Sequence, residues 1–173
     1  MFKLSLLILQ ILASGLPYGP NIFDDFVAGD VLASLRLLHY PSQETEDERQ
    51  LGVGAHTDYG AITLLLQDET PGLQVFNDAD KTWVPIPPNK DAYVVNIGDM
   101  LAMWTQGVFK SGLHRVINRS TKGRYSLPYF FDGNLKCVLA PFDGSFKKQV
   151  LSVEEHIHAR RMDAYSRGSS EKT

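Results

Sequence analysis

His56 and Asp58, in the stretch GAHTDYG (54–60), have the residue types and the spacing of metal ligands. In an extended chain, residues i and i+2 face the same side, so both side chains can point at one ion. An H-x-D pair also arises by chance, and His114, on a later predicted strand, supplies the third candidate. Two imidazoles and one carboxylate form the facial triad typical of non-haem Fe(II) sites that bind O2. Zinc is the competing metal, but it more often uses three ligands and a water in a tetrahedral site.

Arg124 and Ser126 are candidates for binding an anionic cosubstrate beside this metal. They end the predicted hairpin LHRVINRSTKGRYS (113–126), which begins next to His114. Both can face the same side as the metal, and a guanidinium binds a carboxylate through two hydrogen bonds while a serine hydroxyl adds another. The alternative is that Arg124 only caps a surface turn, as exposed arginines often do.

Other polar residues receive structural interpretations. We expect His39 to point away from the site or to flank it, and Asp99 to be a turn residue. His156 and His158 fall on a late polar helix, where we expect both to be solvated.

Composition narrows the class of protein. The chain has 173 residues, 43% of them hydrophobic and 21% charged, as expected for one globular domain with a sizeable core. Its net charge of −3 and pI of about 5.9 argue against nucleic acid or an anionic membrane as a partner. A single cysteine, Cys137, which we expect to be a buried, inert thiol, excludes an intrachain disulfide and fits a reducing, cytoplasmic location.

Short predicted strands recur along the chain and are separated by Gly, Pro and Asn/Asp turns. This pattern predicts a mainly β fold, an all-β sandwich or jelly roll. The predicted strands are residues 31–41, 62–67, 73–76, 82–86, 92–97, 101–105, 113–118 and 124–131.

Helices are expected at both ends of this β region. In MFKLSLLILQILASG, the residues Leu4, Leu7, Ile8, Ile11 and Leu12 follow the spacing of an amphipathic core helix, although the run also imitates a signal peptide. The run is too short to span a bilayer. Ser152 and Glu155 have capping-box spacing and predict a second helix that runs to about Tyr165. Residues 42–50 read as a solvated acidic loop.

Residues 31 to 132 resemble the 2-oxoglutarate and Fe(II)-dependent dioxygenases of the isopenicillin N synthase-like superfamily. The resemblance rests on LRLLHYP (35–41), on GAHTDYG, and on the pattern H-x-D…H…R-x-S, all of whose positions are present. It implies a double-stranded β-helix (jelly roll) with flanking N-terminal and C-terminal helices. It also implies a single dioxygenase domain, residues 1–173 with a core of about 31–145, that lacks the family's usual N-terminal region.

The resemblance also implies the roles of the site residues. His56, Asp58 and His114 would bind Fe(II), while Arg124 and Ser126 would hold the distal carboxylate of 2-oxoglutarate, helped by Tyr40. Leu38 stands where many plant members carry asparagine, and Phe130 matches a position that often packs against substrate. The implied reaction uses O2 and 2-oxoglutarate to oxidise a C–H bond of a small organic molecule, plausibly in secondary metabolism, with release of succinate and CO2. Hydroxylation is the expected outcome.

Two alternatives remain at this point. An oxidase similar to isopenicillin N synthase would use the R-x-S pair to hold its substrate and would consume no 2-oxoglutarate. A catalytically silent chain would serve as a binding or regulatory module. Because the family's N-terminal region packs on the jelly roll, its absence predicts exposed hydrophobic surface.

Overall fold

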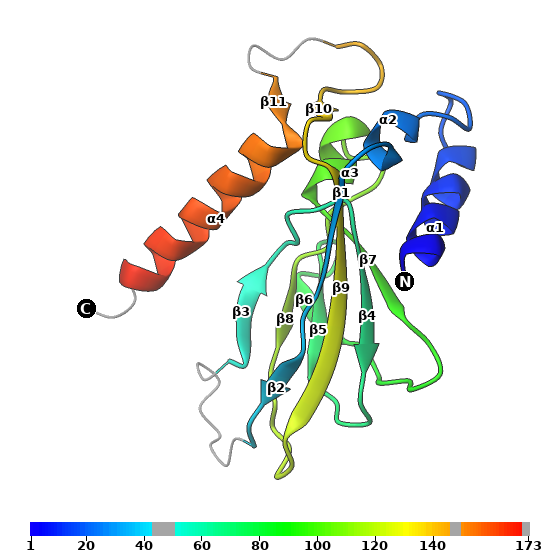
Figure 1. The fold of residues 1–173 in the computed structure, drawn as a ribbon. Helices are drawn as coiled ribbons and strands as arrows, with labels where there is room; N and C mark the ends of the chain where they lie inside the picture. Colours follow the sequence, from blue (N-terminus) through cyan, green and yellow to red (C-terminus); the bar gives the residue numbers. More distant parts are fainter. Residues whose placement is uncertain (43–50, 146–149, 171–173) are drawn as a thin grey trace.

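Two antiparallel sheets form the body of the protein (Figure 1). The computed structural model describes residues 1–42, 51–145 and 150–170. The first sheet has the order β1-β9-β4-β7, with β2 also paired to β9: β1 (Val31–Leu35), β2 (Leu38–Tyr40), β4 (Ile62–Gln67), β7 (Val94–Ile97) and β9 (Arg124–Asn134). The second has the order β3-β8-β5-β6: β3 (Val53–His56), β5 (Leu73–Asn77), β6 (Thr82–Pro85) and β8 (His114–Val116). This is the double-stranded β-helix expected from the sequence.

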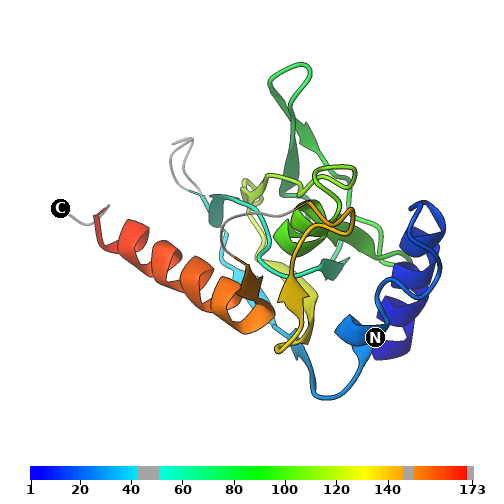
Figure 2. The same cartoon turned by 90° about the horizontal axis from the view of Figure 1, so that it is seen from above.

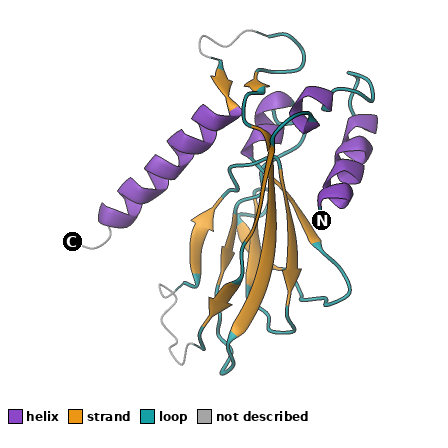
Figure 3. Cartoon of the chain, in the orientation of Figure 1, coloured by secondary structure: helices purple, strands orange, loops and turns teal. Residues whose placement is uncertain are grey.

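Helices cover one end of the β-helix and flank it on both sides (Figures 2 and 3). They are α1 (Phe2–Ser14), α2 (Asp24–Val27), α3 (Asp99–Trp104) and α4 (Val153–Ser170). A small separate sheet pairs β10 (Val138–Leu139) with β11 (Leu151–Ser152) immediately before α4. None of the helices in the described ranges combines the length and apolar character that a bilayer crossing requires.

Most predicted strands are present, but two predictions need correction. The strand expected at 31–41 is split into β1 and β2, which pair with different parts of the long strand β9. The strand expected at 101–105 is wrong, because this segment belongs to helix α3. Its buried residues Met100, Leu101 and Trp104 have helical spacing, and a short apolar run does not distinguish strand from helix by itself.

The N-terminal helix forms as predicted, but it buries a different face. Its buried residues are Ser5, Leu9 and Ala13, whereas Leu7 is 53% exposed and Ile11 is 62% exposed. A helix that is apolar on nearly every side has no stripe to reveal which face is buried, so tertiary packing decides. Leu7 and Ile11 therefore leave apolar side chains on the surface of α1.

The start of the C-terminal helix has the predicted capping box. The Ser152 hydroxyl accepts a hydrogen bond from the Glu155 backbone N–H at 3.2 Å. The Glu155 carboxylate accepts from the Ser152 backbone N–H at 2.8 Å. These two bonds satisfy N–H groups that the first turn of a helix leaves without partners. The helix runs to Ser170, beyond the predicted end.

Successive side chains of the central strands point alternately to an outer apolar core and to a cavity between the two sheets. On β4, Ile62 and Leu64 belong to the apolar cluster under the helices, while Thr63 and Leu65 line the cavity between the sheets. On β9, Phe131 faces the same outer cluster. Near the end of β9, Gly133 has a φ of 69° at a bulge, and a side chain there would collide with the Phe26 ring.

Candidate metal and cosubstrate site

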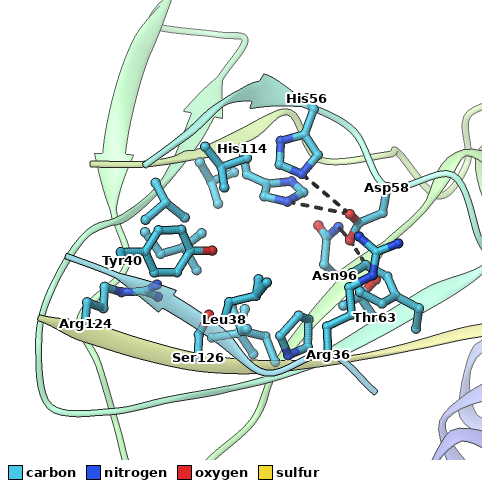
Figure 4. Close-up of a pocket in the computed structure, with 18 residues that line it drawn as sticks. Arg36, Leu38, Tyr40, His56, Asp58, Thr63, Asn96, His114, Arg124 and Ser126 are labelled. Carbon is cyan, nitrogen blue, oxygen red and sulfur yellow. Dashed lines mark hydrogen bonds and ion pairs between the residues drawn. The ribbon is translucent and has the colours of Figure 1, made fainter. Parts of the chain in front are cut away.

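His56, Asp58 and His114 converge at one point inside the β-helix (Figure 4). His56 and His114 are directly opposite partners on the antiparallel strands β3 and β8, and Asp58 follows β3 by two residues. The Asp58 Oδ1 atom lies 3.8 Å from Nε2 of His56 and 3.7 Å from Nε2 of His114. All three candidate ligand atoms lie within 4.8 Å of one another, a spacing that one metal ion can bridge.

Hydrogen bonds orient each of the three side chains. Nδ1 of His56 lies 2.8 Å from the Gly54 carbonyl oxygen, and Nδ1 of His114 lies 2.9 Å from that of Gly112. Because a carbonyl only accepts, Nδ1 of each ring carries a proton, and the neutral form of each ring would present the Nε2 lone pair to the shared point. Backbone acceptors of this kind are typical of metal-binding histidines.

Among the described residues, the hydrogen-bond donors to the Asp58 carboxylate engage one of its two oxygens. Its Oδ2 atom accepts hydrogen bonds from the Thr63 hydroxyl at 2.6 Å and from the Asn96 side-chain amide at 2.8 Å. These donors leave Oδ1 directed at the two imidazoles, as Figure 4 shows. Thr63 lies on β4 and Asn96 on β7, so the first sheet positions a ligand that the second sheet's connection supplies. The sequence analysis did not identify either donor.

The electrostatic environment favours a neutral imidazole at His56. Burial lowers the pKa of His56, and the neighbouring His114 lowers it further. A neutral imidazole is the form that binds a metal, so burial favours the protonation state that a metal-binding His56 would need.

The first turn of α3 holds the backbone of the loop after β3 that carries the candidate ligand Asp58, here called the Asp58 loop. The N–H groups of Asp99 and Met100 donate to the carbonyls of Asp58 and Gly60, at 2.8 and 3.2 Å. Gly98 permits this approach, because a Cβ atom there would collide with the Gly60 carbonyl. The N–H groups that a helix start leaves free therefore stabilise the loop that carries Asp58.

Helix α4 contacts the same loop from its outer side through Arg160. Its Nη2 atom lies 2.9 Å from the Asp99 carboxylate and donates to the Thr57 hydroxyl at 3.0 Å. The guanidinium also lies over the Tyr59 ring, 4.8 Å from its centre. Asp99, expected to be a simple turn residue, therefore connects α3 and α4 with the Asp58 loop. Its carboxylate also accepts a hydrogen bond from the Ser111 hydroxyl.

The late histidines behave differently from each other. His156 is buried, with 6% of its surface exposed, and its Nε2 lies 3.0 Å from the Tyr59 carbonyl oxygen, so the expectation that it is solvated is wrong. Burial lowers its pKa. The sequence predicted a polar C-terminal helix but could not indicate which of its faces packs against the Asp58 loop. His158 is exposed as expected, and His39 is exposed and stacks on Tyr125.

Arg124 lies at the other end of the cavity from the metal ligands (Figure 4). It is fully buried, and it donates from Nη2 to the Gln67 side-chain oxygen at 2.8 Å. Its Nε and Nη1 atoms are buried without a hydrogen-bond partner among the described residues. Burial lowers the pKa of Arg124, which Tyr40 and Asp68 oppose. The interpretation of Arg124 as a surface turn cap is therefore wrong.

Ser126 and Tyr40 accompany Arg124 in the wall of the cavity. Tyr40 is the strand partner of Arg124, and the guanidinium carbon lies 5.1 Å from the centre of its ring. Ser126 is 1% exposed and pairs with Leu38 on β2. The cavity, of about 210 Å³, extends from these residues to the three metal-ligand candidates along an aliphatic wall that includes Val94.

Comparison with known proteins agrees with this geometry. The model of the 2OG-Fe(II) oxygenase superfamily matches residues 32–133. The chain belongs to this superfamily. It is 49% identical to the 2-oxoglutarate-dependent dioxygenase citB of Monascus ruber, over 96% of this chain and 53% of that protein. It is 42% identical to the clavatol oxidase claD of Penicillium crustosum, over 96% of this chain and 52% of that protein.

Solved structures of superfamily members share the fold. A full-length Neurospora crassa protein in complex with alpha-KG superposes with a TM-score of 0.83 at 34% identity, over 95% of this chain and 54% of that one. JOX2 in complex with 2OG, Fe and JA superposes with a TM-score of 0.78 at 31% identity, over 88% of this chain and 46% of that one. The present chain thus spans about half the length of these relatives.

Proposed function

We propose that this chain is an Fe(II)- and 2-oxoglutarate-dependent oxygenase that hydroxylates a C–H bond of a small organic molecule, plausibly in secondary metabolism. The balanced reaction converts substrate C–H, O2 and 2-oxoglutarate into C–OH, succinate and CO2. We further propose that residues 1–173 act as a single dioxygenase domain with its core at about 31–145, and that the protein is cytoplasmic.

One observation carries the proposal: the same cavity is lined by a facial triad and by a buried guanidinium, two of whose nitrogen atoms have no hydrogen-bond partner among the described residues. A buried charge with unmet donors is costly, and a carboxylate removes that cost by accepting two hydrogen bonds. A dicarboxylic 2-oxo acid fits both ends, because its 2-oxo acid end can bind the metal while its distal carboxylate reaches Arg124. The donor set of the triad suits Fe(II).

Each residue then has a stated task. His56 and His114 bind the metal through Nε2, and Asp58 binds it through Oδ1. Arg124 holds the distal carboxylate, and we assign Ser126 a second donor to it and Tyr40 a place beside it. When bound, Fe(II) and 2-oxoglutarate together supply the activation of O2 that oxidises the substrate. The aliphatic cavity wall keeps water from the cosubstrate.

An anaerobic titration tests the proposal. We expect Fe(II) and 2-oxoglutarate together to produce a weak visible charge-transfer band in the purified chain. His56→Ala and Asp58→Ala should abolish the band, and Lys136→Met, a charge loss on an exposed loop, should leave it intact. CO2 release from labelled 2-oxoglutarate then separates this function from an oxidase that consumes none. If Fe(II) and 2-oxoglutarate together give no band in the wild-type chain, the proposal fails.

A further inference from the structure

A second cavity, of about 160 Å³, also borders the metal-ligand candidates. Its wall includes His56 and Asp58, so it reaches the same metal position as the Arg124 cavity. It contains neither Arg124 nor Ser126, and its remaining wall carries Arg36, Asp132 and Arg161. The Arg124 cavity accounts for the cosubstrate, so this second cavity is free for the substrate.

Two guanidiniums and two carboxylates line this cavity: those of Arg36 and Arg161, of Asp132, and of the candidate metal ligand Asp58. Arg36 follows β1, and Arg161 projects from α4. Burial raises the pKa of Asp132 to about 6, while the positive charges of Arg161 and Arg36 oppose the rise, so both guanidiniums lie near this carboxyl group. Within the described ranges, no hydrogen bond or ion pair engages either guanidinium. In the proposed function Asp58 binds the metal ion, so Asp132 alone remains to balance the two guanidiniums, and the cavity of the metal-bound protein keeps an excess positive charge.

The position of Arg36 directs this charge toward the reacting centre. Arg36 lines both cavities, and its side chain extends toward the Asp58 end of the site in Figure 4. Its guanidinium carbon lies 5.2 Å from the centre of the Phe130 ring, which also borders both cavities. Both arginines reach solvent, so a ligand can approach them from outside.

We propose that this cavity is the substrate subsite and that it takes a small organic carboxylate, held by Arg36 and Arg161 beside the Phe130 ring. The assignment rests on the proposed function, whose metal site lies at the inner end of the cavity. A guanidinium presents a planar pair of donors that matches a carboxylate, and two of them define both its position and its orientation. The remainder of the substrate then lies between the arginines and the metal, with an aromatic face along one side.

A matched pair of probes, benzoate and benzamide, tests this subsite because they share one shape and differ in charge. The wild-type chain is first loaded with Fe(II) and saturating 2-oxoglutarate under anaerobic conditions, so that Arg124 is already occupied. Calorimetric titration then measures the dissociation constant of each probe. We expect benzoate to bind at least about tenfold more tightly than benzamide, as charge-assisted hydrogen bonds require.

Variants assign the preference to the two arginines. In Arg36→Met/Arg161→Met the ratio of the two dissociation constants should fall to within about threefold of unity, since the charge-assisted donors are gone. The charge-transfer band with 2-oxoglutarate should persist in that variant. Arg161→Met alone, a change on the exposed face of α4, should lower the ratio of dissociation constants without disturbing the fold. If the double variant loses the band, the ratio measured for this single variant tests the subsite instead. Lys136→Met controls for the loss of positive charge and should keep the ratio.

Equal binding of both probes to the wild-type chain, or an unchanged ratio in the arginine variants, overturns the subsite while the band still supports the oxygenase. Absence of the band in the wild-type chain overturns the proposed function and the subsite with it.

Discussion

Replacing Arg124 by methionine should separate cosubstrate binding from folding stability. Methionine is of similar length and removes the charge, including the Nε and Nη1 donors that lack partners among the described residues. Two charge-assisted hydrogen bonds to a carboxylate contribute about 1.5–3 kcal/mol each, or roughly 3–6 kcal/mol together. Since 1.4 kcal/mol corresponds to a factor of ten, the dissociation constant of 2-oxoglutarate should rise by about 10²- to 10⁴-fold.

The same substitution should have little effect on the ligand-free protein. It removes the 2.8 Å hydrogen bond to Gln67 and the contact with the Tyr40 ring, which is destabilising. It also removes a fully buried charge, two of whose nitrogen atoms lack a hydrogen-bond partner in the described part of the chain, which is stabilising. Replacing such buried charges by apolar residues is often neutral for stability. We therefore expect the free energy of unfolding to change by no more than about 1–2 kcal/mol.

The assay combines anaerobic titration of 2-oxoglutarate, followed through the charge-transfer band, with urea denaturation of the ligand-free chain. Fe(II) affinity should remain at the wild-type value, because Arg124 lies at the far end of the cavity from the triad. Arg124→Lys, which keeps a charge but loses the planar fork, should give an intermediate loss. An affinity for 2-oxoglutarate within threefold of wild type in Arg124→Met would refute the assigned role.

Three further changes test the supporting structure. Thr63→Val, which removes a 2.6 Å hydrogen bond to a metal ligand at nearly constant volume, should weaken Fe(II) binding by about 10- to 100-fold in an anaerobic metal titration, and an unchanged affinity would contradict the positioning role. Arg160→Met breaks the contacts with Asp99 and Thr57, so it should lower the free energy of unfolding by about 1–2 kcal/mol and the Fe(II) affinity by about tenfold. Urea denaturation measures the first effect and metal titration the second, and equal values for variant and wild type would contradict the proposed role of Arg160. Burial raises the pKa of Asp132 to about 6 from 3.8, so this carboxyl group stabilises the metal-free fold most at pH below 3.8 and loses that contribution as pH rises through 6. Asp132→Asn should therefore be more stable than wild type by about 1–3 kcal/mol at pH 8, with no advantage near pH 4, in urea denaturation with a chelator; the opposite pH trend would disprove the assignment.

Much of the site could be predicted because its chemistry depends on residue type and local spacing. The i, i+2 relation of His56 and Asp58 is a property of any extended segment, and the R-x-S pair follows the same rule. The positions of most strands could be predicted for the same reason, because Gly, Pro and Asn favour turns in the backbone within a few residues of their own positions. The acidic segment predicted as a loop at 42–50 lies almost entirely outside the described residues.

Helix α3 could not be predicted, because its six residues are too few for periodicity to distinguish a helix from a strand. The prediction of the buried face of α1 was wrong for a related reason. When a helix is apolar on nearly every side, the elements that pack against it determine which face is buried. His156 was predicted to be solvated because the C-terminal helix is polar on average along its length. Only one face of that helix packs against the protein, however, and His156 lies on that face.

The sequence by itself determined the ligand types, the pairing of His56 with Asp58 and the mainly β architecture, because each follows from covalent spacing and short-range propensity. Only the tertiary structure decided that His114 is the strand partner of His56 and that Thr63 and Asn96 hold Asp58 by one oxygen. It also decided that Arg124 is buried, with two nitrogen atoms that find no partner in the ranges the structure describes. These facts join residues that are far apart in the chain. They depend on strand register and on which groups burial removes from water, and neither is a property of any local stretch of residues.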